Sequence, residues 1–187
     1  MDSIRCFDVL FAFLGIVILL PFFIVIALLI KLTSAGSILF KQNRVGKNNV
    51  DFKLFKFRTM QINAESKGQL TVGGRDSRIT NVGYFLRKFK LDELPQLFNV
   101  LNGTMSLVGP RPEVRKFVNF YTVEQQKVLL VLPGITDFAS IEFRNENELL
   151  ANATNPEQYY IEVIMPKKID LNKQFIENRT LKNYFSI

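Results

Sequence analysis

The hydrophobic pattern is dominated by one apolar run near the N-terminus. From Val9 to Ile30, 22 consecutive residues carry no charge and no strongly polar side chain. A helix of that length reaches roughly 33 Å, which is enough to cross the hydrocarbon core of a membrane. A signal peptide is disfavoured, because the charges before the run sum to −1 and the run exceeds the usual apolar region of such peptides. A buried helix of a soluble protein would be unusually long and apolar on every side.

Pro21 lies near the middle of this run. Proline removes one helical hydrogen bond and clashes with the preceding turn, which predicts a kink or break at Leu20-Pro21. Two arrangements follow: a kinked helix that spans the bilayer, or a re-entrant helix-break-helix that enters and leaves through one leaflet. Hydropathy alone favours the spanning helix, because a re-entrant segment must satisfy freed backbone groups at depth.

The pattern after the apolar run predicts a β-hairpin and then mainly helices. Strands are expected over residues 37–42 and 51–58, around a turn at 46–49. Helices are expected from Asn81 to about Phe89 and from Asp92 to about Asn102-Gly103. Three further helix starts are predicted: Pro112, the capping box Thr122/Gln125, and Asn155-Pro156-Glu157. The helix that starts at Asn155-Pro156-Glu157 is expected to be interrupted at Pro166.

These elements predict a mainly α protein with a small β-hairpin, in two parts. Residues 1–35 form the membrane segment, and residues 36–187 form a compact domain associated with the membrane interface. The short basic final segment has no second apolar span.

Charge places the domain relative to the membrane. Residues 31–60 carry seven Lys or Arg side chains against Asp51 alone, a net of +6 in a chain of net charge +7. Basic flanks of a membrane segment stay cytoplasmic, and each basic residue near an anionic leaflet adds about 1 kcal/mol of attraction. The simplest alternative is a basic juxtamembrane flank without further function. Nucleic-acid binding is not expected, because no RNP, zinc-finger or helix-turn-helix signature accompanies the charge.

The composition restricts the chemistry. The chain has no His and one Cys, Cys6, so it has no imidazole base, no His-ligated metal, no internal disulfide and no zinc cluster. Proton transfer or covalent chemistry is left to carboxylates, Lys, Tyr, Ser, Thr or that thiol.

The strongest candidate for such chemistry is Asp92-Glu93. Asp92 falls at a predicted N-cap, Glu93 at the first helical position, and Pro95 in the first turn. A helix N-terminus favours negative charge, so it keeps Asp92 ionised and also accepts a phosphate. An ionised aspartate beside a phosphate can attack phosphorus and form an acyl phosphate, and Glu93 could share a Mg²⁺. The alternative is that Asp92 only caps the helix and Glu93 interacts with its dipole.

Two weaker candidates accompany this pair. In Ser106–Pro112, two prolines stiffen the backbone around Arg111, which could present a guanidinium to a phosphate with little ordering entropy, or could simply form a tight interhelical turn. Strand alternation puts Lys56 and Arg58 on one face, which taken alone is an ordinary solvated strand face.

These pieces, taken in order, resemble the monotopic phosphoglycosyl transferases, the bacterial sugar transferases that initiate glycan assembly on a polyprenol phosphate. The resemblance runs from the apolar segment to about Ala139. Each motif is weak alone, but six in this order on a 187-residue chain are very specific. The six are Phe40–Gly46, Phe55–Met60, Arg78–Thr80, Leu91–Leu97, Ser106–Pro112 and Pro133–Thr136.

The resemblance implies a phosphotransferase that moves a sugar 1-phosphate from a UDP-sugar to undecaprenyl phosphate, with Mg²⁺. By carry-over, Asp92 attacks the sugar-bearing phosphate, UMP leaves, and the polyprenol phosphate then attacks the phosphosugar-enzyme intermediate in a ping-pong sequence. Glu93, with Asp92, is the expected metal partner. The reaction would initiate the assembly of a membrane glycan, such as a polysaccharide or lipopolysaccharide.

The resemblance also assigns basic residues to the handling of phosphate or nucleotide. Arg58, Arg87 and Arg111 match such positions, and Arg144 matches more loosely. The rival hypothesis is a catalytically silent, membrane-anchored protein that binds anionic lipid or an assembly partner.

Family precedent reverses the preference for a spanning helix. Members use a re-entrant helix broken at a proline, matching Leu20-Pro21, with both ends at the cytoplasmic face of the bacterial inner membrane and downstream glycosyltransferases as expected partners. Leu20 stands where the family commonly has Ser, so it is open which group satisfies the carbonyls freed at the kink. Asp137-Phe138-Ala139 stands where Gly-Trp-Ala is frequent, and this change could alter the sugar or nucleotide pocket.

Overall fold

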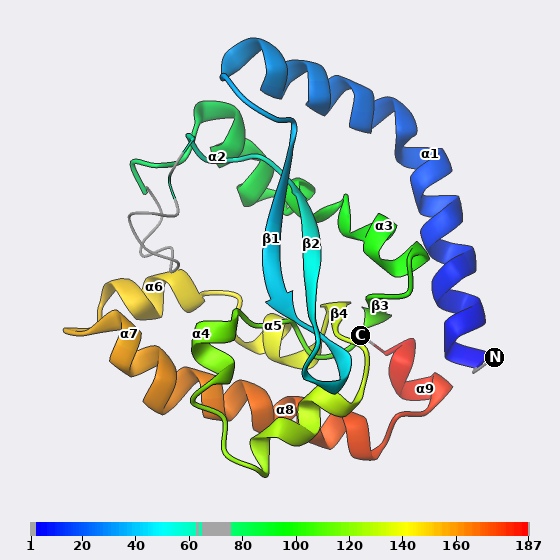
Figure 1. Cartoon of the computed structure of the whole chain (residues 1–187), viewed down its shortest axis with the longest axis vertical. Helices are drawn as coiled ribbons and strands as arrows, with labels where there is room; N and C mark the ends of the chain where they lie inside the picture. Colours follow the sequence, from blue (N-terminus) through cyan, green and yellow to red (C-terminus); the bar gives the residue numbers. More distant parts are fainter. Residues whose placement is uncertain (1–2, 63, 65–75, 187) are drawn as a thin grey trace.

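A long N-terminal helix lies along one side of a domain built from short helices and two small sheets (Figure 1). The computed structural model describes residues 3–62, 64 and 76–186. Helix α1 (Ser3–Thr33) is one uninterrupted helix with Pro21 inside it, and its axis bends along its length (Figure 1). Leu20 and Pro21 are both exposed.

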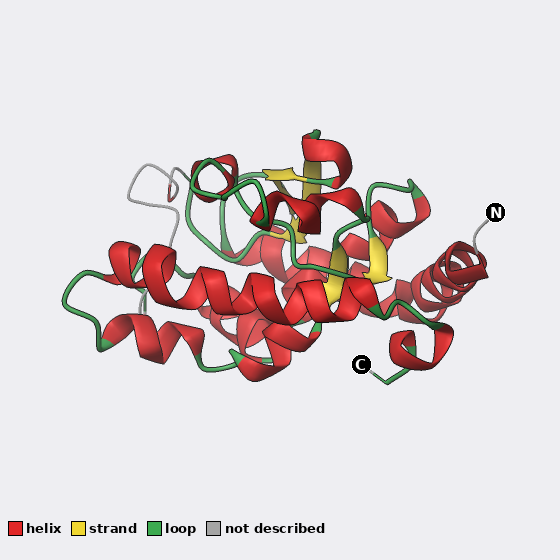
Figure 2. Cartoon of the chain, turned by 90° about the horizontal axis from the view of Figure 1, so that it is seen from below, coloured by secondary structure: helices red, strands yellow, loops and turns green. Residues whose placement is uncertain are grey.

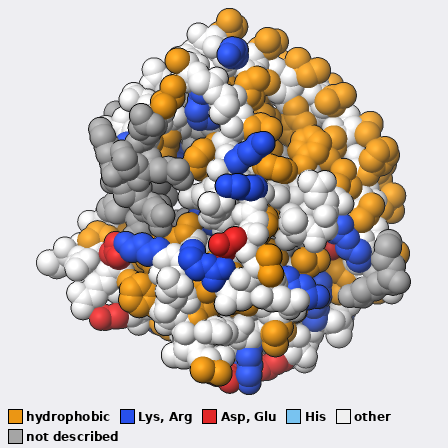
Figure 3. Space-filling model, viewed as in Figure 1, with side chains coloured by type: hydrophobic (Ala, Val, Ile, Leu, Met, Phe, Trp, Pro, Cys, Tyr) orange, Lys and Arg blue, Asp and Glu red, His pale blue; other side chains and the backbone are white. Residues whose placement is uncertain are grey.

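Helix α1 exposes most of its large apolar side chains. By length and composition it is the one helix among the described residues that could cross a membrane, and only 17% of its most apolar window is buried. Hydrophobic side chains gather along it in Figure 3. A narrow stripe that includes Phe23, Ile26 and Ile30 packs instead on Phe57 and Leu86 of the domain. The exposed remainder is the composition expected of a surface in contact with lipid.

A buried carboxylate anchors the start of α1. The Oδ1 atom of Asp8 accepts hydrogen bonds from Ser106 Oγ at 3.0 Å, the Leu107 N–H at 2.8 Å and the Tyr184 hydroxyl at 2.7 Å. These partners come from strand β3 (Ser106–Val108) and helix α9 (Leu181–Tyr184). Because burying a carboxylate is costly unless it is hydrogen-bonded, these bonds fix α1 at one place on the domain.

The predicted hairpin is confirmed. Strands β1 (Leu39–Val45) and β2 (Asp51–Phe57) pair antiparallel across the short 3-10 turn η1 (Lys47–Asn49). Asn48 and Asn49 have φ of 57° and 63°, a left-handed conformation that Asn tolerates better than most residues.

A second, parallel pair was not predicted. Strands β3 and β4 (Gly134–Thr136) lie side by side, with Ser106 opposite Gly134. A Cβ atom on Gly134 would lie 2.1 Å from the Gly109 nitrogen, so this close approach requires glycine.

The helices around residue 92 differ from the prediction. Helix α2 (Asn81–Lys88) forms as expected, although Thr80 is its cap and accepts the Gly83 N–H at 2.9 Å. The helix expected from Asp92 to Asn102 is two elements, the 3-10 turn η3 (Leu91–Glu93) and helix α3 (Gln96–Leu101). Lys90, at φ 57°, turns the chain into η3, and Pro95, which has no N–H to donate, starts α3. Asp92 is therefore not an N-cap.

The C-terminal part supplies the remaining helices. Helix α4 (Arg115–Val118) begins three residues after the predicted Pro112, whereas the capping box Thr122/Gln125 is confirmed at the start of η4 (Gln125–Leu130). Helices α5 (Phe138–Glu142) and α6 (Glu146–Ala151) follow β4.

Pro166 does not interrupt the last long helix, contrary to the prediction. Helix α7 (Pro156–Tyr159), capped by Asn155, continues through the π-helical turn η5 (Tyr160–Ile164) into α8 (Met165–Glu177) as one rod (Figure 2). The wider π turn precedes Pro166 and makes room for its ring. Tyr160, Ile164 and Ile169 of this rod pack on Phe117 and Leu150 to form the largest core cluster.

Candidate active site

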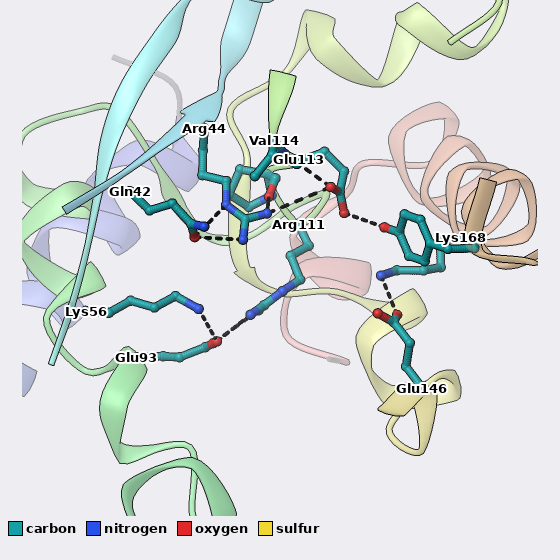
Figure 4. Close-up of polar contacts among 11 residues, drawn as sticks. Gln42, Arg44, Lys56, Glu93, Arg111, Glu113, Val114, Glu146 and Lys168 are labelled. Atoms are coloured by element: carbon teal, nitrogen blue, oxygen red, sulfur yellow. Dashed lines mark hydrogen bonds and ion pairs between the residues drawn. The ribbon is translucent and has the colours of Figure 1, made fainter. Parts of the chain in front are cut away.

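Two cations converge on Glu93. Lys56 Nζ, from β2, lies 2.9 Å from Glu93 Oε1, and Arg111 NH1, from the loop after β3, donates to Oε2 at 3.1 Å. The second guanidinium nitrogen of Arg111 also contacts Oε1. Figure 4 shows Lys56 and Arg111 reaching Glu93 from different elements, so that both carboxylate oxygens are occupied.

This arrangement shifts the protonation of all three groups. Burial alone would raise the pKa of Glu93, but Arg111 and Lys56 hold that pKa well below its usual range. Burial lowers the pKa of Lys56 to about 8, although Glu93 opposes the shift. The pKa of Arg111 is raised despite burial, because Glu93 stabilises its charged form. Glu93 is therefore a permanently ionised anchor for two cations.

Asp92 has the opposite environment, one residue away. Its side chain is buried, with 6% exposed, and no described group donates a hydrogen bond to its carboxylate. Burial raises the pKa of Asp92; Lys56 and Arg87 oppose the shift, and the charge of Glu93 adds to it. Neighbouring carboxylates whose environments separate their pKa values have different chemical roles. Both oxygens of Glu93 pair with cations, whereas those of Asp92 accept no hydrogen bond from the part of the chain that the structure describes.

A cleft of about 600 Å³ opens beside Asp92, and we call it the Asp92 cleft. Its described lining includes eight Lys or Arg side chains and four Asp or Glu side chains. Basic side chains gather near the centre of the face in Figure 3, with an acidic side chain between them. A cleft with this excess of positive charge suits a ligand with several phosphate charges.

Three predicted arginines line this cleft together: Arg58, Arg87 and Arg111. Arg58 is 8% exposed, and its NH2 donates to the carbonyl and the hydroxyl of Ser34, each at 2.8 Å. Its Nε and NH1 are buried and have no hydrogen-bond partner among the described residues. Arg87 Nε donates to Thr59 Oγ1 at 2.9 Å, and burial lowers its pKa. The unpaired nitrogens of Arg58 are the donors an anionic ligand would satisfy.

Arg144, the fourth predicted arginine, lies apart from Asp92. It lines a second cleft of about 490 Å³, which shares six lining residues, Glu93 and Arg111 among them, with the Asp92 cleft. We call it the apolar cleft because of five of its lining side chains: Leu94, Leu97, Ile135, Ile141 and Phe143.

The structure changes the interpretation of one weak candidate and adds one residue that the sequence reasoning missed. Lys56 is not on a solvated strand face, because its side chain is 16% exposed and paired with Glu93. The missed residue is Asp137. Asp137 is fully buried, and it accepts the Arg111 N–H at 2.8 Å and the Asn172 side-chain amide at 3.1 Å. It is also the N-cap of α5, accepting the Ser140 N–H at 2.5 Å.

The carboxylates offer a limited set of metal ligands. No group of three or more His, Cys, Asp or Glu side chains forms a metal cluster in the part of the chain that the structure describes. The oxygens of Asp92 accept no hydrogen bond from the described residues and are of the kind that Mg²⁺ prefers, while those of Glu93 are engaged by Lys56 and Arg111. Asp92 could therefore serve as one ligand of a Mg²⁺.

Comparison with known proteins identifies the family. The family model described as "Bacterial sugar transferase" matches residues 3–187. The chain belongs to the bacterial sugar transferase family. This assignment agrees with the order of motifs in the sequence.

Named relatives lie within the same family. One is the UDP-N-acetylgalactosamine-undecaprenyl-phosphate N-acetylgalactosaminephosphotransferase of Aeromonas hydrophila, 46% identical over 140 residues, which cover 73% of this chain and 33% of that protein. The UDP-glucose:undecaprenyl-phosphate glucose-1-phosphate transferase of Escherichia coli is 36% identical over 86% of this chain and 35% of that protein. The exopolysaccharide production protein ExoY of Sinorhizobium fredii is 38% identical over 77% of this chain and 70% of its own length. The chain thus spans about a third of the first two relatives and most of the third.

Proposed function

We propose that this protein transfers a sugar 1-phosphate from a UDP-sugar to undecaprenyl phosphate through a covalent intermediate on Asp92. A carboxylate oxygen of Asp92 bonds to the sugar-bearing phosphorus, and the bond from that phosphorus to the bridging oxygen breaks, which releases UMP. An oxygen of undecaprenyl phosphate then bonds to the same phosphorus, the bond to Asp92 breaks, and the carboxylate is restored. Neither step needs a proton, which agrees with a chain that has no His.

The observation that carries this proposal is the contrast between Asp92 and Glu93. A nucleophile needs ionised oxygens without strong competing partners, and the Asp92 carboxylate accepts no hydrogen bond from the described residues. Glu93 holds Lys56 and Arg111 beside it, where their charges can stabilise the phosphoryl oxygens as the charge on them shifts. The rival, a silent membrane-anchored binding protein, gives no reason for a carboxylate that is buried in a basic cleft and accepts no hydrogen bond from the described residues.

Two arginines complete the phosphate-binding part of the proposal. Arg58 has two unpaired donors, and Arg87 lines the same cleft. A guanidinium binds phosphate oxygens in a bidentate manner, so these residues would hold the diphosphate while Asp92 attacks.

Asp92 would hold Mg²⁺. Glu93 would be a second ligand once Lys56 or Arg111 no longer occupied one of its oxygens. When bound, the ion would neutralise part of the charge of the diphosphate.

We also propose that α1 enters and leaves the inner membrane from the cytoplasmic face. The UDP-sugar is water-soluble and the acceptor is held in the membrane, so both must reach Asp92 from one interface. A basic segment follows α1, and cytoplasmic flanks are usually basic. Single cysteines at positions 3 and 35, in a Cys6→Ser background, should both be labelled from the cytoplasmic side. Labelling from opposite sides would establish a spanning helix instead.

The first half-reaction, the transfer of the sugar phosphate to the enzyme, can be tested without the lipid acceptor. With a UDP-sugar and Mg²⁺ but no lipid acceptor, the purified protein should release UMP and gain the mass of a sugar phosphate. A panel of UDP-sugars identifies the donor. Asp92→Asn should lose both signals, and unchanged UMP release by this variant would refute the assignment of the nucleophile.

A further inference from the structure

The Asp92 cleft and the apolar cleft meet along a shared wall. The six residues that line both clefts are Lys90, Glu93, Arg111, Glu146, Asn147 and Lys168. In the proposed reaction the acceptor phosphate must pass this wall to reach the phosphorus held by Asp92, which lines only the first cleft. The residues that line only the apolar cleft include five apolar side chains and Arg144, which indicates that this cleft accepts a different part of the substrates.

The apolar cleft has a hydrophobic wall that continues into the membrane helix. Leu94 and Leu97 of this wall belong to the same packed cluster as Phe23 and Ile26 of α1. Leu97 reaches α1 closely enough that a Cβ atom on Gly15 would lie 3.3 Å from its Cδ1. The wall of the apolar cleft and the domain-facing side of α1 therefore belong to one apolar cluster, and an apolar chain beside α1 would lie close to this wall.

The lining of the apolar cleft is also basic. It has four cations, against Glu93 and Glu146. These cations are Lys90, Arg111, Arg144 and Lys168, and all but Arg144 also line the Asp92 cleft. An apolar wall that ends in positive charge is complementary to an amphiphile with an anionic head. A nucleotide sugar, which is polar along its whole length, matches the Asp92 cleft better.

We propose, on the basis of the proposed function, that the apolar cleft binds the phosphate end of the polyprenyl acceptor. The phosphate faces Arg111, and the first isoprenyl units lie along Leu94, Leu97 and Ile141. The UDP-sugar occupies the Asp92 cleft on the other side of the Glu93–Arg111 pair. Arg144 then serves the acceptor rather than the nucleotide.

The test separates the two half-reactions in Ile141 variants. Ile141 is 51% exposed, so Ile141→Ser leaves no cavity in the core. We expect UMP release without acceptor to stay at the wild-type rate, while KM for the polyprenyl phosphate rises about tenfold. Ile141→Leu should restore the KM. Leu130→Ser is the matched control, because Leu130 is 62% exposed and is not among the described residues that line either cleft.

A short-chain, water-soluble polyprenyl phosphate sharpens the test. Because the contact is with the first isoprenyl units, the rise in KM should persist with this acceptor. A normal KM for both acceptors, or slower UMP release without acceptor, would overturn the assignment of the cleft. Absence of UMP release by the wild-type protein would instead refute the proposed function, so the two failures are distinct.

Discussion

The carboxylate of Asp137 accepts the backbone N–H of Arg111 at 2.8 Å. The same carboxylate binds the Ser140 N–H of α5 and the side-chain amide of Asn172 in α8. Three separate parts of the chain are thus joined beneath the guanidinium that pairs with Glu93. Asp137 positions Arg111 without approaching the substrate clefts itself.

Asp137→Ala should therefore reduce both stability and activity. The variant leaves buried donors unpaired, at a cost of roughly 3 kcal/mol in the free energy of unfolding. Urea unfolding in detergent measures this loss, and kcat measured well below the unfolding temperature should also fall. Asp137→Asn keeps one acceptor oxygen and should recover part of both. A variant that loses stability but retains full kcat would contradict the positioning role.

Asp92→Asn should abolish turnover without reducing stability. Burial raises the pKa of Asp92, so the folded state binds this proton more tightly than the unfolded state does. The stability from this group is present at low pH and is lost as pH rises from the unfolded pKa, near 3.9, through the higher folded pKa. Asn avoids the cost of a buried charge. The melting temperature at pH 7 should equal or exceed that of the wild type, and a clear decrease would show that the carboxylate stabilises the fold.

Activity should decrease above pH 8 as Lys56 loses its proton. Its pKa is about 8 in the folded protein, compared with 10.5 for an ordinary lysine. Between these values the unfolded state holds more protons, so this group favours folding as pH rises, while the site loses a positive charge. Rate and stability should therefore change in opposite directions. Lys56→Arg should shift the alkaline limb of the pH–rate profile upward by at least about one unit. If the alkaline limb does not shift, the loss of activity above pH 8 is due to a group other than Lys56.

Glu93→Ala should be destabilising, in contrast to Asp92→Asn. Removing the carboxylate leaves Lys56 and Arg111 together without their shared counter-charge, and breaking a buried pair costs about 3 kcal/mol. Chemical unfolding measures this cost. The double variant Glu93→Ala/Lys56→Met removes one of the stranded charges and should recover part of the loss. If the double variant is less stable than the single one, the two side chains are not coupled as described.

The sequence predicted the hairpin and the capping box at Thr122, because these depend on neighbouring residues. It did not predict the split between η3 and α3, which depends on a left-handed Lys90 together with Pro95. The β3–β4 pairing joins segments that are far apart in the chain, and three-residue strands give no periodic signal.

The same distinction between local and long-range determinants applies to the candidate site. Asp92 and Glu93 were named as a pair, but their division into a free and a saturated carboxylate depends on Lys56 and Arg111, which reach them from β2 and from the loop after β3. The role of Asp137 depends on the tertiary contact with Arg111. Local patterns therefore pointed to Asp92 and Glu93 as candidates, and long-range packing gave the two carboxylates different surroundings.

The hydrogen bonds of Asp8 impose an order on biosynthesis. Asp8 leaves the ribosome 98 residues before its donor Ser106 and 176 residues before its donor Tyr184. During translation the apolar helix can meet the bilayer before the residues that bind Asp8 on the domain have been synthesised. The hydrogen bonds of Asp8 can therefore form only after residues 106 and 184 have been made, so the docking of α1 on the domain is a late event in folding.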